Sequence, residues 1–130
     1  MTQHIIARIA IYLLAVIMII FGIYHFQQPR NLLVFVPDNL PGGIIWVYVT
    51  GVVFILTAIA FLANKFVKLA AYLLAALLIV FILTIHLPNY RLAGEAEMRQ
   101  NAFINMLKDL ALAAFALHIA GSADKKGMKY

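Results

Sequence analysis

The sequence predicts an all-α fold: a polytopic membrane protein built as a bundle of four transmembrane helices. Of its 130 residues, 65% are hydrophobic, and the mean hydropathy is +0.98, whereas a soluble domain is usually about 45–50% apolar. A bilayer core about 30 Å thick takes roughly 20 apolar residues of helix. Four segments have that length, and because they lack strand-like alternation, helices are favoured over a barrel.

We expect these helices within one transmembrane domain, 1–130, at about 5–26, 43–63, 66–87 and 103–120. The first is expected to be retained rather than cleaved as a signal peptide, because it is too long and no small-residue cleavage site follows it. Residues 121–130 form the predicted cytoplasmic tail.

The connecting segments are predicted from their helix-breaking residues. The loop 27–42 contains Pro29, Pro37 and Pro41, which are expected to keep it non-helical. Pro88 is expected to end the third helix, and the charged stretch 89–101 to form a solvated loop or a surface helix.

The distribution of basic residues predicts that both termini are cytoplasmic. Six Lys and Arg lie on the side that holds the termini and the middle loop, and three lie on the other side. The six are Arg8, Lys65, Lys68, Lys125, Lys126 and Lys129; the three are Arg30, Arg91 and Arg99. An excess of positive charge marks cytoplasmic loops, so we expect an inner-membrane protein whose loops 27–42 and 89–101 face outward.

Composition also limits the chemistry of this chain. It has no cysteine, so thiolate nucleophiles and thiolate-held metal centres are excluded for the chain alone. Its only serine, Ser122, lies at the inner end of the last helix. The charge of +5 is spread over loops and ends without a dense basic stripe, which does not favour nucleic acid as a partner. No catalytic residue and no metal site is assigned.

Polar side chains within the apolar segments gather toward the outer ends of the helices. The candidate ligand-binding residues are Tyr24, His25, His86, Asn105, Lys108 and Asp109. An ionisable group at membrane depth costs about 2.5–3.5 kcal/mol at a helix centre, so it normally faces the bundle interior with a partner. Asp109 shares a helical face with Asn105, Ala113 and Ala116 and is expected to point inward, toward His25 and His86.

Simpler interpretations of the same residues stay open. Asp109 could form a structural ion pair with His25, Lys108 or Arg30, and each histidine could be an interfacial packing residue. Two histidines on different helices could ligate haem in principle, but no ligand spacing supports it, and haem is not favoured. Lys108, about 100° around the helix from Asp109, is expected to snorkel to the outer interface.

Three sequence stretches together resemble the DoxX-like family of small four-helix bacterial membrane proteins. They are G-I-Y-H-F-Q-Q-P at 22–29, T-G-V-V-F-I-L-T-A-I-A-F-L at 50–62 and N-M-L-K-D-L-A-L at 105–112. The resemblance implies a four-helix bundle of the bacterial inner membrane; one branch is named for a thiosulfate:quinone oxidoreductase, another is linked to detoxifying redox complexes, and many members have no defined activity. Many relatives carry a Glu where this sequence has Phe54, which argues against transferring carboxylate-dependent chemistry. The matching residues are His25 and the Lys108–Asp109 pair.

Three functional classes therefore remain. The first is a redox-associated subunit that holds a quinone or similar lipid near the outer leaflet, with His25 or His86 hydrogen-bonding a carbonyl oxygen and Asp109 tuning the histidine. The second is an assembly protein without chemistry, whose Ala113 and Ala116 face packs on another membrane or periplasmic subunit. The third is a small carrier, for which inverted repeats are missing. The sequence leaves open whether the protein is an enzyme or an oligomer.

Overall fold

A computed structural model describes residues 2–34, 36, 38 and 41–130. The described residues form α1 (Thr2–Gln27), α2 (Pro29–Leu33), α3 (Ile44–Ala63), α4 (Val67–Phe81), the π-helical segment η1 (Ile82–His86), α5 (Leu87–Leu92) and α6 (Ala96–Ser122). Four helical stretches are long and apolar enough to cross a bilayer: His4–Gln27, Ile44–Ala63, Val67–Leu92 and Ala96–Ser122. The predicted all-α class with four membrane-spanning helices is confirmed, and the protein is an integral membrane protein.

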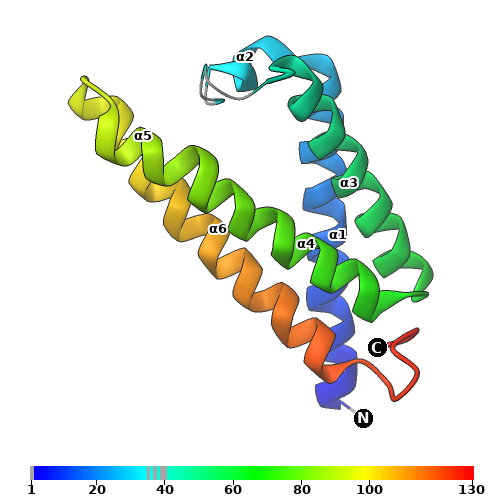
Figure 1. Cartoon of the computed structure of the whole chain (residues 1–130). Helices are drawn as coiled ribbons and strands as arrows, with labels where there is room; N and C mark the ends of the chain where they lie inside the picture. The colour runs from blue at the N-terminus through cyan, green and yellow to red at the C-terminus, as the bar shows by residue number, and fades with distance from the viewer. Residues whose placement is uncertain (1, 35, 37, 39–40) are drawn as a thin grey trace.

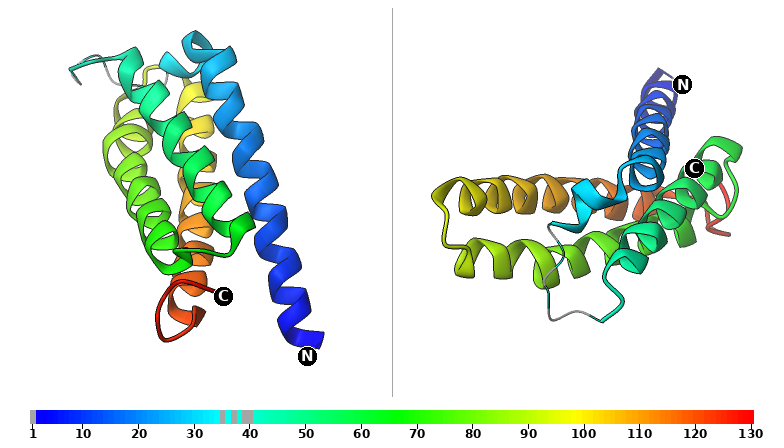
Figure 2. Two further views of the ribbon diagram at one scale, coloured as in Figure 1. Left: turned by 90° about the vertical axis from the view of Figure 1, so that its right-hand side faces the viewer. Right: turned by 90° about the horizontal axis from the view of Figure 1, so that it is seen from above.

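The spanning helices are arranged as two antiparallel pairs. α1 packs along α3, while α4 and its continuation through α5 pack along α6 (Figure 1). The two pairs lie close together at the end that holds both chain termini and diverge toward the other end, as the view from above also shows (Figure 2). We call these ends the terminal end and the divergent end.

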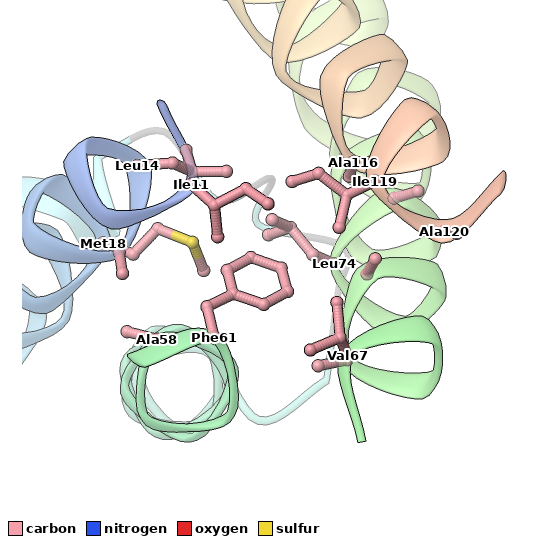
Figure 3. Close-up of a cluster of buried hydrophobic side chains, with 14 of the residues drawn as sticks. Ile11, Leu14, Met18, Ala58, Phe61, Val67, Leu74, Ala116, Ile119 and Ala120 are labelled. Carbon is pink, nitrogen blue, oxygen red and sulfur yellow. The ribbon is translucent and has the colours of Figure 1, made fainter. Parts of the chain in front are cut away.

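The core shared by all four helices lies near the terminal end. Phe61 of α3, 1% exposed, sits at its centre, with Ile11 and Met18 of α1 on one side and Leu74 of α4 on another (Figure 3). Alanines of α6 and the fully buried Ile119 close the cluster. Small side chains let these helices approach closely, which matters in lipid because packing, rather than exclusion of water, drives helix association.

Two glycines make the close contact between α1 and α3 toward the divergent end. A Cβ added at Gly51 would lie 3.1 Å from the carbonyl oxygen of Gly22 and 3.0 Å from the Cβ of His25. A Cβ added at Gly22 would lie 3.0 Å from the carbonyl oxygen of Gly51. The backbones thus touch where neither residue has a side chain, and this contact fixes how His25 sits against α3.

The third spanning helix continues beyond the position where its end was predicted. Pro88 does not end it: residues 67–92 remain helical, passing through a π turn in which the N–H of Leu87 bonds to the carbonyl of Ile82. A proline ring inside a helix meets the carbonyl four residues back, here that of Thr84. The wider π turn accommodates the ring without breaking the helix.

Of the two alternatives for 89–101, the solvated loop is wrong for most of the length, and the helical residues are the ends of two spanning helices rather than a separate surface helix. The first residues of this stretch belong to α5 and its last to α6, which begins at Ala96 rather than near 103, leaving only the link 93–95. The prediction took the charged side chains on these turns as a sign that the spanning helices had ended. Charged side chains indicate contact with water, which a helix can also have. At the other ends, α1 reaches Gln27 and α6 ends at Ser122.

The loop 27–42 also contains a short helix, α2, contrary to the expectation of a non-helical segment. Pro29 lies at its first turn, where the missing N–H needs no partner and the fixed φ suits a helix. Pro37 lies outside the described residues. Pro41 accepts a hydrogen bond at its carbonyl oxygen from the indole nitrogen of Trp46.

The segment after α6 folds back onto the terminal end. The backbone N–H of Lys68 donates to the carbonyl of Gly127 at 2.8 Å, so this segment satisfies a free donor in the first turn of α4. The N–H of Tyr130 donates to the Asn64 side chain at 2.9 Å, and Arg8 of α1 donates to the Tyr130 carbonyl at 3.3 Å. Residues 123–130 thus join α1, the α3–α4 link and α4.

Candidate functional site

Asp109 faces into the bundle, as the helical period of α6 predicts. α6 packs against α4, η1 and α5. The side chains on one of its faces are buried or half-buried at three- and four-residue spacings: Ala102, Met106, Asp109, Ala113, Ala116 and Ala120. On this face the Asp109 carboxylate meets the imidazole of His86, with Oδ2 and Nε2 2.7 Å apart. The two side chains are 18% and 12% exposed, so the pair is largely shielded.

The position of His86 follows from the irregular backbone beside it. His86 is the last residue of the π segment, two residues before Pro88. A π turn contains one residue more than the α turn it replaces, so it rotates the following side chains relative to a regular helix, and such turns are frequent at functional sites. Pro88 lies inside the helix together with this π turn, and the turn directs the His86 side chain toward α6.

The second ring nitrogen of His86 is unusual. Nδ1 is buried and has no hydrogen-bond partner among the described residues. An ionised carboxylate can only accept hydrogen bonds, so with Asp109 ionised the proton lies on Nε2, and the neutral ring presents Nδ1 as a bare acceptor. Buried polar atoms without partners are rare in folded proteins and call for an explanation.

His25 does not join this pair. Its Nδ1 lies 2.6 Å from the carbonyl oxygen of Phe21 in the same helix, and its ring packs edge-on against Phe54 of α3, with centroids 5.4 Å apart. α1 and α6 belong to the two helix pairs that separate toward this end of the molecule (Figure 1). The Asp109 carboxylate was expected to face the imidazoles of both His25 and His86, but it faces only that of His86. Similar depth along two helices does not by itself bring their side chains together.

The other predicted residues lie around rather than within the pair. Lys108 is exposed, and Asn105 is half-buried on the Asp109 side of α6; neither makes a hydrogen bond or an ion pair with a described residue. Tyr24 is 39% exposed on α1, with its hydroxyl 3.5 Å from the Asn31 amide. Of the six candidates, the structure brings together only His86 and Asp109.

One feature of this end of the molecule was not predicted from the sequence. A concavity of about 410 Å³ lies beside the α5–α6 link, lined by Tyr90, Arg99, Gln100 and Phe103. The basic residues of 89–101 were the available signal, but treating that stretch as a connection between two spans, loop or surface helix, hid their place on α5 and α6.

A lone imidazole–carboxylate pair has a defined chemical capacity. The carboxylate fixes the ring orientation and tautomer and stabilises the imidazolium that forms when the ring accepts a proton, as in other histidine–aspartate pairs. Among the described residues, no group of three or more histidine, aspartate or glutamate side chains is placed to hold a metal ion. The arrangement is suited to proton exchange with a polar group that reaches Nδ1.

Comparison with known proteins identifies the family of the chain. The family described as Domain of unknown function (DUF8561) matches residues 14–120, which include all four spanning helices or most of each. The chain therefore belongs to this family. No curated protein and no solved structure matches it. The family description assigns no activity, so the functional argument depends on the site.

Proposed function

We propose that the protein is a DoxX-like, redox-associated subunit of the bacterial inner membrane that holds a quinol, or a similar hydroxyl-bearing lipid, against His86. The observation that carries the proposal is the shielded His86–Asp109 pair with its unpartnered Nδ1. Intramembrane ionisable residues are expensive and are usually retained for function. The resemblance at 22–29, 50–62 and 105–112 supports the same class but supplies no site beyond His25 and Lys108–Asp109.

While the His86 ring is neutral, the residues fit a hydroxyl-bearing ligand better than a carbonyl, because a bare Nδ1 can only accept a hydrogen bond. With Asp109 ionised, His86 Nδ1 accepts a hydrogen bond from a hydroxyl and can take its proton, while Asp109 stabilises the resulting imidazolium. The protonated ring can then donate from Nδ1 to a carbonyl oxygen. A quinol bound there would supply the two-electron chemistry, while His86 would hold its oxygen and accept its proton and Asp109 would stabilise the protonated ring.

Access to Nδ1 requires movement of side chains, because the atom is buried. The π turn beside it is where the helix already departs from regular hydrogen bonding. We place the ligand on the flank of α4–α6 toward the divergent end, where α1 and α3 do not cover these helices (Figure 1).

The experiment is ligand-dependent stability with matched histidine variants. Purified protein in mild detergent is heated with and without a short-chain ubiquinol, and unfolding is followed by circular dichroism. A ligand at one hundred times its Kd stabilises the folded state by about 2.7 kcal/mol. We expect this stabilisation in the wild type and in His25→Leu, and its loss in His86→Leu. No stabilisation of the wild type at saturating quinol, or equal stabilisation of His86→Leu, would overturn the proposal.

We further propose that the terminal end is cytoplasmic, which puts the His86 pair nearer the periplasmic face. Support comes from the six basic residues at the terminal end against three at the divergent end. Because the chain has no cysteine, single cysteines report topology cleanly. A membrane-impermeant maleimide should label Gly94→Cys in intact cells and label Lys126→Cys only after permeabilisation; the reverse pattern would invert the orientation.

A second candidate, an assembly protein without chemistry, is favoured by one observation: Asp109 has its partner inside the chain, as a purely structural pair would. The partner surface expected at Ala113 and Ala116 is wrong, because both are buried within the bundle, at 2% and 0% exposure. A second subunit that co-purifies with the wild type and with His86→Leu alike, together with a failed quinol test, would favour this class.

A further inference from the structure

The concavity beside the α5–α6 link lies outside the His86 pair and has a chemistry of its own. It is lined by Arg99, Gln100, Tyr90 and Phe103, which together bring a cationic, an amide and two aromatic side chains to one place. Arg99 and Asp109 are ten residues apart on α6, which places Arg99 about 15 Å farther along the helix axis. With Asp109 inside the apolar span, Arg99 reaches the level of the lipid headgroups.

The Arg99 guanidinium is available for a ligand. It makes no hydrogen bond or ion pair with any residue that the structure describes, although Glu95 and Glu97 are close in sequence. A guanidinium has five donors in a planar fork that matches two oxygens of a phosphate. Gln100 and Tyr90 line the same concavity and carry an amide and a hydroxyl that can also bond to phosphate oxygens.

Apolar groups continue from the concavity along α6. The rings of Tyr90 and Phe103 lie together with centroids 5.5 Å apart. Below them on the same face of α6, at helical spacing, Leu107 and Leu110 are 49% and 55% exposed. Arg99 thus lies nearer the end of α6 than the exposed apolar ridge formed by Phe103, Leu107 and Leu110. A phospholipid has the same order, with its phosphate at the membrane surface and its acyl chain below it.

We propose that this concavity binds a phospholipid by its phosphodiester group, with Arg99 holding two phosphate oxygens and an acyl chain lying along Phe103, Leu107 and Leu110. Arginine is favoured at phosphate sites because its planar guanidinium donates two parallel hydrogen bonds to phosphate oxygens. The free phosphate ion shares the headgroup chemistry but cannot use the apolar ridge, which is why we assign the site to a lipid.

Native mass spectrometry with added phosphatidylglycerol tests the assignment. Arg99→Gln removes the fork, while Arg91→Gln removes the same charge from an exposed position on α5 that does not line the concavity. We expect lipid binding to weaken about tenfold or more in Arg99→Gln, because charge-assisted hydrogen bonds are lost, and to change little in Arg91→Gln. Arg99→Lys keeps the charge without the fork, and its affinity should fall between wild type and Arg99→Gln.

Two results would overturn the proposal. Equal weakening in Arg91→Gln and Arg99→Gln would show diffuse attraction of anionic lipid rather than a site. Displacement of the lipid by a molar excess of inorganic phosphate would show that the apolar ridge contributes nothing and that the ligand is a free phosphate. Retention of the lipid under that excess supports the assignment. The circular dichroism spectrum of each variant is compared with that of the wild type. If Arg99→Gln is misfolded, Arg99→Lys takes its place in the comparison.

Discussion

Removing either member of the His86–Asp109 pair should destabilise the protein more than removing both. In the single variants His86→Leu and Asp109→Val, the remaining polar group stays shielded among α4, η1 and α6 with no partner. In the double variant, no such group remains. The pair lies at 2.7 Å with 12% and 18% exposure, so solvent cannot replace the lost partner fully.

The size of the single losses depends on whether the pair is charged. Leaving a neutral donor or acceptor buried without its partner costs about 1–3 kcal/mol, whereas leaving one ion of a buried pair alone costs about 3–5 kcal/mol. Replacing a buried pair by apolar groups of similar volume is often neutral or stabilising. We therefore expect the double variant to lie near the wild type.

Unfolding of the purified variants in mixed detergent micelles, titrated with SDS and followed by circular dichroism, gives the four free energies of this double-mutant cycle. Lys108→Leu serves as the control, because Lys108 is exposed beside Asp109 and has no described partner; its effect should stay within about 0.5 kcal/mol. Strictly additive losses from His86→Leu and Asp109→Val would refute the coupling and, with it, the pair as a unit.

Two further changes test the packing of the helices. In the same SDS titration, Gly51→Ala should destabilise the protein by about 1–3 kcal/mol, since its Cβ would meet the Gly22 carbonyl oxygen at 3.1 Å where α1 packs on α3. Gly121→Ala is the control: its Cβ would have nothing within 4 Å, so the change should be neutral or stabilising. Gly127→Ala should loosen the C-terminal segment, because Gly127 has φ +73° and touches Lys68; faster trypsin cleavage at Lys125 would show it, and unchanged cleavage would contradict it.

The four spans and the inward face of α6 could be predicted because hydropathy and helical period decide them locally. Asp109 points where the spacing of Ala113 and Ala116 indicates, since one buried stripe on a helix is read directly from the sequence. The partner of Asp109 could not be predicted in the same way. In lipid, every face of a spanning helix can be apolar, so the sequence does not say which helices pair.

The failures have local causes. Pro88 was expected to end a helix because the rule for proline describes regular α-helix, and a π turn relaxes it. Treating 89–101 as a connection, either a solvated loop or a surface helix, then concealed the positions of Tyr90 on α5 and Arg99 on α6. The joining of Arg8, Asn64 and Lys68 by residues 123–130 depends on backbone atoms of the tail, which leave no pattern in side-chain type.

The divergence of the two helix pairs gives the protein a wedge shape across the bilayer. The pairs lie close together around Phe61 at the terminal end and spread apart at the other (Figures 1 and 2). The protein therefore occupies a larger cross-section in one leaflet than in the other, and lipids must fill the difference. In the leaflet that holds the divergent end, lateral pressure of the lipids pushes the two helix pairs together. The angle between the pairs should therefore respond to membrane curvature and to the shape of the lipids.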